Sequence, residues 1–164
     1  MRFRGEHQNK VDTKGRMSIP APFRRVLEAN DPEWKSGDAP RVIVVYGGPT
    51  RKQLECFSVN AMAKVEDKIE AMPRGSKRRR SLQRLYLAQS LETTVDETGR
   101  LVLPKAQRDK IGIETAATFA GNGDTFEIWN PDTYEEEIYA DLDADDDFDP
   151  DVDPSVYLDG DEGE

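Results

Sequence analysis

A stretch of ten residues near the start of the chain is written twice. The first copy is Val11-Asp12-Thr13-Lys14-Gly15-Arg16-Met17-Ser18-Ile19-Pro20, and it returns 84 positions later as Val95-Asp96-Glu97-Thr98-Gly99-Arg100-Leu101-Val102-Leu103-Pro104. The valine, aspartate, glycine, arginine and proline are identical, and two further positions stay apolar. Two copies are too few for a solenoid, so the repeat predicts a duplicated module that folds as an intramolecular pseudo-dimer.

Each copy has the residue pattern of a tight turn between two strands. Asp12 suits the first position of the turn and Gly15 the fourth, where a left-handed backbone conformation costs glycine little. Residues 16–19 alternate polar and apolar, as in a strand with one buried face, and Pro20 ends that strand. In the second copy the corresponding strand, turn and strand are expected at residues 91–95, 96–99 and 100–103.

Periodicity and turn residues place the remaining elements. Strands are expected at residues 5–11, 41–46, 53–57, 115–120 and 125–129, and helices at about 22–30, 59–71, 76–89, 104–110 and 133–140. The predicted fold is mainly β with short helices, in the α+β class. The expected domains are a first module at 1–58, linker helices at 59–90, a second module at 91–140 and a disordered acidic tail at 141–164.

The net charge of −10 is unevenly distributed along the chain. Residues 141–164 contain twelve acidic residues and no lysine or arginine, which leaves residues 1–140 with 23 basic and 21 acidic residues and a net charge of +2. A segment with high charge density and few apolar residues buries too little apolar surface to offset the entropy lost on ordering. This composition predicts disorder in the tail. The body is near neutral and carries basic clusters such as Lys77-Arg78-Arg79-Arg80, which is either a solvated helical face or a basic patch near phosphate.

The residue inventory excludes several kinds of site. Cys56 is the only cysteine, so neither an intrachain disulfide nor a cysteine-rich zinc site can form, and His7 alone supplies no second soft ligand. Cys56 is predicted to be a buried strand residue. No catalytic constellation is present, so we expect no enzyme activity, cofactor, metal or small-molecule substrate. Without a bilayer-spanning apolar run or a signal-peptide pattern, the chain is predicted to be cytosolic and to make no membrane contact.

The repeated Asp-x-x-x-Arg unit is the candidate site. An aspartate so close to an arginine across a turn is most simply an ion pair that fixes the turn. The arginine can have a second role, because a guanidinium held on a rigid hairpin is oriented in advance to grip a phosphate or a guanine edge.

The duplicated pattern Val-Asp-x-x-Gly-Arg-x-x-Ile/Leu-Pro resembles the MraZ family, bacterial proteins made of two AbrB-type (SpoVT-AbrB) domains. The resemblance covers residues 1 to about 140 and extends to Phe3-Arg4-Gly5, residues 79–87 and Trp129-Asn130. It implies two tandem swapped-hairpin β modules at 1–58 and 91–140. The chain departs from the family pattern in its extra Met1-Arg2, in residues 86–89, which lack small glycine-rich residues, and in its acidic tail.

The resemblance also implies a function. Family members are sequence-specific DNA-binding repressors of the operon for cell division and cell wall synthesis. They form homo-oligomeric rings that bind tandem promoter repeats, which implies a cytoplasmic, nucleoid-associated protein with double-stranded DNA as partner. The residues implied to bind DNA are Asp12 and Arg16 in the first copy and Asp96 and Arg100 in the second. To these candidates we add Lys14 and the turn glycines Gly15 and Gly99, and also Arg2 and Arg4, which add charge near the first copy.

The two copies differ in charge. The first turn holds Asp12, Lys14 and Arg16, a net of +1, whereas the second holds Asp96, Glu97 and Arg100, a net of −1. Because phosphate affinity depends on local charge, we expect the first turn to be the stronger DNA contact.

Two hypotheses for the tail stay open. It keeps the protein soluble, or it competes with DNA as a flexible polyanion for the same basic surface. An alternative function also stays open, because AbrB-type domains serve in antitoxins whose C-terminal extension wraps a protein partner. Two domains in one chain are unusual for that role.

Overall fold

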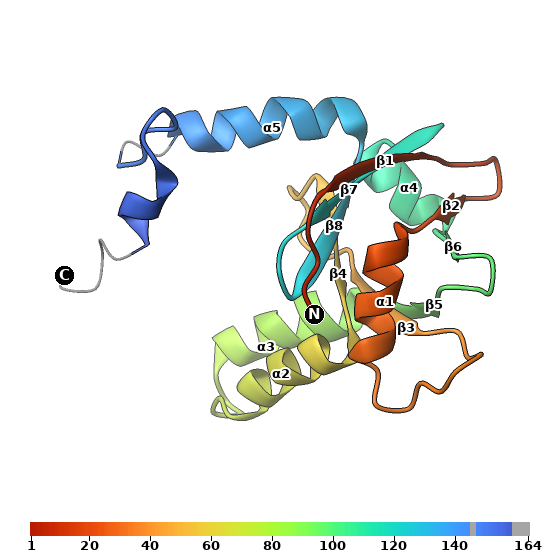
Figure 1. Cartoon of the computed structure of the whole chain (residues 1–164). Coiled ribbons are helices and arrows are strands. Elements are labelled where there is room, and N and C mark those ends of the chain that lie inside the picture. Colours follow the sequence, from red (N-terminus) through yellow and green to blue (C-terminus); the bar gives the residue numbers. More distant parts are fainter. Residues whose placement is uncertain (145–146, 159–164) are drawn as a thin grey trace. The chain divides into compact units, whose positions relative to one another are not determined.

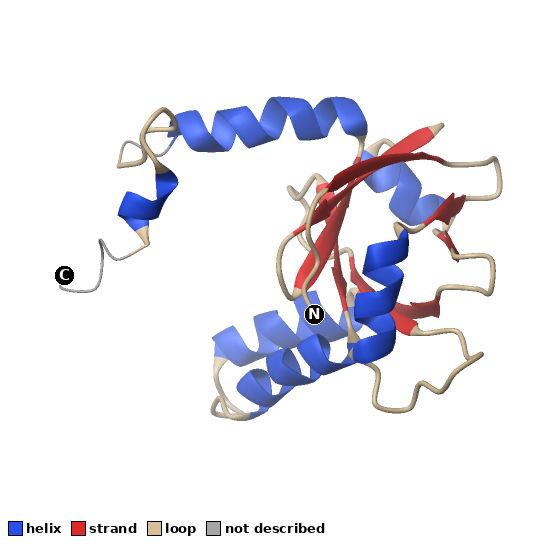
Figure 2. Cartoon of the chain, viewed as in Figure 1, coloured by secondary structure: helices blue, strands red, loops and turns tan. Residues whose placement is uncertain are grey.

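The computed structural model describes residues 1–144 and 147–158 and divides into two compact units, Met1–Pro131 and Asp132–Glu164. Both copies of the repeat lie in the first unit (Figures 1 and 2). Its elements in chain order are β1 (Glu6–Lys10), β2 (Arg16–Ser18), α1 (Ala21–Ala29), β3 (Arg41–Val45), β4 (Gln53–Phe57), α2 (Val59–Glu70), α3 (Lys77–Gln83), a π-helical turn (Arg84–Ala88), β5 (Ser90–Thr94), β6 (Arg100–Val102), α4 (Lys105–Ile111), β7 (Ala116–Gly121) and β8 (Thr125–Trp129).

The two repeats build one antiparallel sheet together. Among the described strands, six follow the order β1-β7-β8-β4-β3-β5, and β2 pairs with β6 in a separate two-stranded ladder. If each strand is exchanged for its counterpart in the other repeat, the order of the large sheet is reproduced in reverse. The sheet therefore has a pseudo-two-fold relation centred between β8 and β4.

The first strand of each repeat pairs with the other repeat. β1 runs against β7, with Glu6 opposite Ala120 and Lys10 opposite Ala116, whereas β5 runs against β3. Only the later strands of each repeat form hairpins within it, β3 with β4 and β7 with β8. Neither repeat can complete its hydrogen-bonded sheet without the other.

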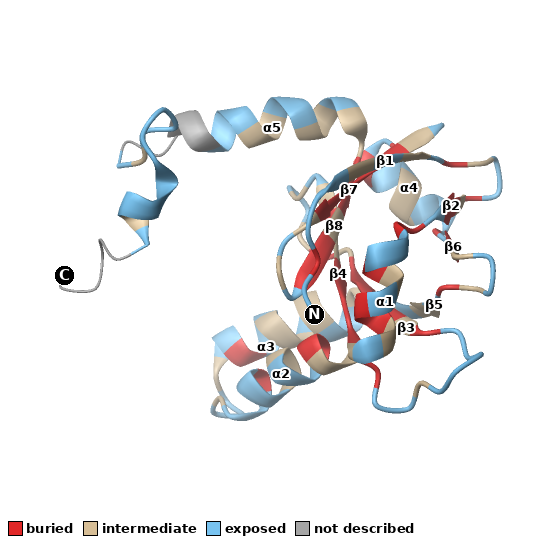
Figure 3. Cartoon of the chain, in the orientation of Figure 1, coloured by how far each residue is buried: buried red, intermediate tan, exposed pale blue. Residues whose placement is uncertain are grey.

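The core confirms the apolar positions of the repeat. Val11, Met17 and Ile19 are buried in the first copy, and Val95, Leu101 and Leu103 are buried in the second. Phe3, Phe23 of α1 and Phe126 of β8 pack with ring centroids 5.0–5.4 Å apart, so one aromatic cluster joins both repeats. The buried segments of β3, β4 and β8 are drawn red in Figure 3. Cys56 lies fully buried in β4, as predicted, and burial raises the pKa of its thiol.

The helices between the repeats are fixed by local capping. Ser58 accepts a hydrogen bond from the backbone N–H of Ala61 (3.1 Å) at the start of α2, and Ser76 accepts one from Arg79 (3.2 Å) at the start of α3. A second, smaller apolar cluster lies where α2 and the π-helical turn pack on the sheet. Its members are Ile43, Val45, Phe57, Ala61 and Met62, with Val59, Val65 and Tyr86 packed against them.

The predicted strands and helices are present, and three details differ. The helix expected at 76–89 changes to a π-helical turn at Arg84. The two strands flanking each repeated turn do not form a ladder with each other, since an isolated bridge between Val11 and Met17 is the only such pairing found among the described residues, and β2 pairs with β6 instead. The last helix, expected to end at Ala140, continues to Ala144.

The acidic segment carries local structure within its described residues. Helix α5 (Pro131–Ala144) begins at the boundary of the second unit, and a short 3-10 helix follows at Pro154–Tyr157. The Tyr157 hydroxyl accepts a hydrogen bond from the backbone N–H of Asp149 (2.8 Å), and its ring packs on Phe148. The predicted tail at 141–164 therefore includes helical turns, and its residues 145–146 and 159–164 lie outside the described part. No described helix is long and apolar enough to cross a membrane.

Candidate nucleic-acid interface

The two repeated turns have the same main-chain geometry. In the first, the N–H of Gly15 donates to the carbonyl of Asp12 (3.0 Å) and the N–H of Asp12 donates to the carbonyl of Arg16 (3.1 Å). The second turn repeats both bonds at 2.9 Å. Gly15 and Gly99 have φ values of +83° and +81°, which an L side chain rarely adopts, so the glycines are required by the turn.

The fold brings the two turns together although they are far apart in sequence. β2 and β6 pair with Met17 opposite Leu101. Beyond this ladder, the N–H of Ile19 donates to the carbonyl of Gly99 (2.8 Å) and the N–H of Leu103 donates to the carbonyl of Gly15 (2.9 Å). Each turn is thereby tied to the strand of the other repeat, and both loops lie on one side of the unit (Figure 1).

In the first turn a carboxylate holds the arginine. One oxygen of Asp12 accepts the backbone N–H groups of Lys14 and Arg16, both at 2.9 Å, and the other accepts the Nε–H of Arg16 at 2.6 Å. The Arg16 and Asp12 side chains are 41% and 38% exposed, so this is an ion pair open to solvent. The backbone and side-chain hydrogen bonds from Arg16 lower the pKa of Asp12. The predicted ion pair is confirmed in this copy.

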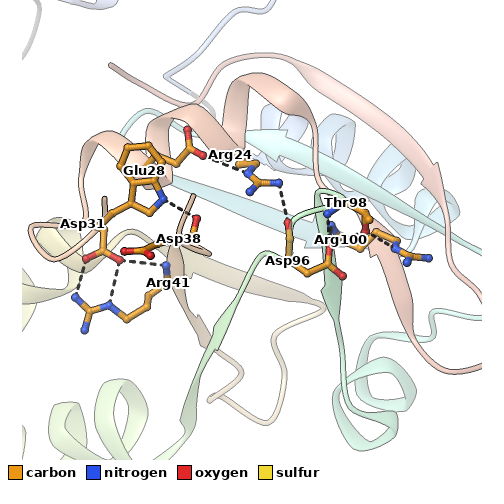
Figure 4. Close-up of polar contacts among 9 residues, drawn as sticks. Arg24, Glu28, Asp31, Asp38, Arg41, Asp96, Thr98 and Arg100 are labelled. Carbon is orange, nitrogen blue, oxygen red and sulfur yellow. Dashed lines mark hydrogen bonds and ion pairs between the residues drawn. The ribbon is translucent and has the colours of Figure 1, made fainter. Parts of the chain in front are cut away.

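In the second turn a hydroxyl holds the arginine (Figure 4). Thr98 donates its hydroxyl to Asp96 (2.7 Å) and accepts the Nε–H of Arg100 (2.9 Å). The hydrogen bond from Thr98 is the main reason that the pKa of Asp96 is lowered, followed by the backbone N–H of Arg100. Within the described chain no ion pair joins Asp96 and Arg100, so the predicted pair is wrong for this copy.

An arginine from the first repeat supports the second turn. Nη1 of Arg24, on α1, donates to the carbonyl of Asp96 (2.7 Å), and its Nε donates to Glu28 (3.2 Å), as Figure 4 shows. Its counterpart Arg108 lies next to Gly15. The second repeat has Gly112 at the position of Glu28, and the buried Nε of Arg108 has no hydrogen-bond partner among the described residues. The two turns are thus braced unequally.

The structure brings most of the predicted site residues together. Lys14 and Glu97 are exposed on the two loops, beside the half-buried arginines. Arg2 and Arg4 are placed elsewhere: they flank Phe3, which pairs with Gly123 in the β7–β8 turn, at the far end of β1 from the first turn.

Sequence reasoning missed the contacts of Thr98 and Arg24. Thr98 differs from its counterpart Lys14, and that difference was the available signal. Arg24 and Arg108 are identical at the repeat spacing, but spacing alone does not show which turn each one supports.

The fold and the paired turns define a class: a duplicated β protein that presents two arginine-bearing loops side by side. The chain matches the MraZ family, described as antitoxin-like, over residues 2–85 and 87–151. It is 59% identical over 135 residues to "Transcriptional regulator MraZ" of Ruegeria sp. (strain TM1040), covering 82% of this chain and 81% of the relative. The same name is given to relatives in Ruegeria pomeroyi, 58% identical with 83% and 81% covered, and in Cereibacter sphaeroides (strain ATCC 17025), 47% identical with 85% and 86% covered.

The chain belongs to the MraZ family. These relatives are named as transcriptional regulators and not as enzymes, which agrees with the sequence-based prediction of a regulator without catalytic residues.

Proposed function

We propose that the chain is a sequence-specific DNA-binding repressor that acts on its own cell division and cell wall operon. The observation that carries this proposal is the pair of arginine-bearing turns joined through β2 and β6. The regulator names of the relatives support it, and the exposed loops offer the positive groups that DNA binding requires.

The turns orient their arginines for recognition. In both copies a hydrogen bond fixes Nε, to Asp12 in the first and to Thr98 in the second. The Nη groups at the tip have no hydrogen bond to any described residue. A guanidinium held in this way can donate two parallel hydrogen bonds to a guanine edge or to a phosphate. Fixing the side chain before binding reduces the entropy lost in the complex.

The larger assembly belongs to the same proposal. The cross-repeat pairing of β1 with β7 and β5 with β3 supports two AbrB-type swapped-hairpin modules. A ring of such chains would present many turns to tandem promoter repeats. Linked weak contacts of this kind gain affinity through their high effective concentration. The proposed location is the nucleoid, in the cytoplasm.

The test compares Arg16→Ala with Arg100→Ala on promoter DNA at one fixed salt concentration. Loss of one good arginine contact costs about 1–3 kcal/mol per site, and we expect the larger loss for Arg16→Ala because its turn has the higher net charge. Arg25→Ala is the matched control, since Arg25 is exposed on α1 and has no predicted DNA contact. Equal losses of affinity would contradict the expected difference between the two turns. No loss of affinity in either variant would contradict the proposed DNA-binding site.

Footprinting on the chain's own promoter tests the operator. Protection of tandem repeats is the expected result, with protection lost in Arg16→Ala. A featureless pattern with the unaltered protein would contradict sequence-specific repression.

A second candidate function is an antitoxin-like module that binds a protein partner. The family description and the acidic C-terminal segment favour it. Co-purification of a small basic protein that is lost when residues 141–164 are deleted would support this candidate over the first.

A further inference from the structure

Part of the linker between the repeats carries a dense positive charge and no acidic residue of its own, although Glu66, Asp67 and Glu70 lie on the neighbouring helix α2. Residues 71–91 contain six basic residues and no acidic one. Five of the six are exposed and make no ion pair to any described residue. We call these five the α3 basic surface; they are Arg74, Lys77, Arg78, Arg80 and Arg84.

The sixth basic residue has a structural role that sets the others in place. Arg79 is buried, and its Nη1 donates to the carbonyls of Glu70 (3.3 Å) and Met72 (2.7 Å) at the end of α2. Glu70 is the last residue of α2 and Met72 follows the helix, so neither carbonyl has an intrahelical partner. The guanidinium therefore caps α2 and anchors α3 to it. Because Arg79 points inward, its neighbours Arg78 and Arg80 are left facing solvent.

Five other cations of the unit are neutralised by carboxylates. Arg16, Arg24, Arg41, Arg51 and Lys105 each form an ion pair. No described carboxylate forms an ion pair with the α3 basic surface, so its cations stay available to an external anion. A ligand with several negative charges at regular intervals would neutralise these cations in place of protein carboxylates.

We propose that the α3 basic surface binds the phosphate backbone of a second DNA segment, in addition to the DNA contacted by the two turns. The proposal rests on the proposed function in one respect, that the turns hold the first DNA segment. Figure 1 shows α2 and α3 away from the two turn loops, on the other side of the unit, so the α3 basic surface is separate from the site formed by the turns.

The chemistry of the surface favours phosphate over a protein partner. Four of its five cations are arginines, which bind phosphate oxygens in a bidentate manner. Lys77, Arg80 and Arg84 follow each other at i, i+3 and i+7 along about 10 Å of helix, comparable with three phosphate steps of about 3.4 Å on one strand. Helix α3 exposes no apolar side chain, whereas the centre of a protein interface is usually apolar or aromatic.

The test variant is K77Q/R80Q/R84Q, which leaves Arg79 in place. Its matched control is K35Q/K64Q/K68Q, which removes the same charge from exposed lysines outside this surface. The first measurement is the slope of log affinity against log salt on a duplex without promoter repeats, and its magnitude should fall by about 2.7 for three lost phosphate contacts. The second is the capture of a free duplex by protein bound to an immobilised promoter, and the variant should lose this capture. The control variant should keep the salt slope and the capture of a second duplex. Circular dichroism should show that both variants are folded.

Two outcomes would overturn the inference. One is an unchanged salt slope with unchanged bridging. The other is a loss of self-association without any change in DNA binding, which would assign the surface to a protein contact. The variant R16A/R100A separates this inference from the proposed function: it should lose the promoter footprint and keep the salt-dependent binding to duplexes without repeats. A retained footprint in that variant would contradict the proposed function. The salt slope and the capture of a second duplex would still test the α3 basic surface.

Discussion

The two turns share a backbone and differ in how they hold their arginine. Asp12 uses both carboxylate oxygens, one for the turn and one for Arg16. In the second turn the Thr98 hydroxyl lies between Asp96 and Arg100 and bonds to both. Lys14, at the position of Thr98, has no hydroxyl to insert. One residue difference therefore decides whether the arginine is held by a charged or by a neutral group.

The comparison shows that main-chain geometry and side-chain chemistry are set separately in this fold. The glycine, the aspartate and the cross-repeat hydrogen bonds define the shape of both loops. The residues between the aspartate and the arginine of each turn set the local charge and the hydrogen bonds that hold the arginine. A duplicated site can in this way diverge in affinity without any change of fold.

The largest expected effect separates the two glycines. A Cβ at position 15 would lie 2.3 Å from the Leu103 carbonyl oxygen, whereas a Cβ at position 99 would meet only Nη1 of Arg24 at 3.9 Å. Both substitutions to alanine carry the cost of a left-handed conformation, about 1–2 kcal/mol. The clash adds about 1–3 kcal/mol to Gly15→Ala alone. Urea denaturation of the two variants should show this order, and equal midpoints would contradict the geometry.

A middle-sized effect is expected for the brace from α1. Arg24→Ala removes the hydrogen bond to Asp96 and should reduce promoter affinity by about 0.5–1.5 kcal/mol through the second turn only. Arg25→Ala removes the same charge from an exposed neighbouring position and should change little. The measurement is a double-mutant cycle in DNA binding.

Arg24→Ala should couple with Arg100→Ala and add independently to Arg16→Ala. Coupling of equal size with both arginines would show that Arg24 supports the whole interface and not one turn. The variant Glu28→Gln, which weakens the partner of Arg24 and leaves the arginine in place, should have a smaller effect of the same kind.

A pH-dependent effect on folding stability concerns a loop that only the first repeat has. Asp31 is buried against Arg41 (2.7 Å), and hydrogen bonds from the Arg41 side chain lower the pKa of Asp31 to about 2 (Figure 4). Because the pKa is lower in the folded state, this stabilisation is present above about pH 4 and is lost as the pH falls toward 2. It amounts to about 1–2 kcal/mol, discounted because Arg41 is partly exposed.

Asp31→Asn should remove that part of the pH dependence. Urea midpoints at pH 5 and pH 2 should differ less for this variant than for the unaltered protein. An identical pH profile for the two proteins would show that the ion pair does not contribute to folding stability.

The sequence allowed the local elements to be predicted better than their partners. Turn residues and alternation located the strands because those signals act within a few residues. They did not identify β6 as the partner of β2, since both strands carry the same pattern. The run Lys77-Arg78-Arg79-Arg80 could not show that Arg79 is buried, because that depends on where α2 ends.

The site was predicted to the same degree. Asp12 and Arg16 were identified with their ion pair, but the Thr98 contact and the support from Arg24 depend on tertiary placement. The charges of Arg2 and Arg4 were assigned by nearness in sequence. The extended β1 strand takes them away from the turn.

The pairing of β1 with β7 and of β5 with β3 has a consequence for synthesis of the chain on the ribosome. The first strand emerges early, but its hydrogen-bonding partner follows only after more than a hundred residues. Until then β1 and β3 present unpaired edges, which are prone to pair with other chains. Completion of the six-stranded sheet also depends on contacts that are distant in sequence, and such contacts slow folding. The nascent first repeat is therefore the stage at which this protein is most exposed to aggregation or to exchange of strands between copies.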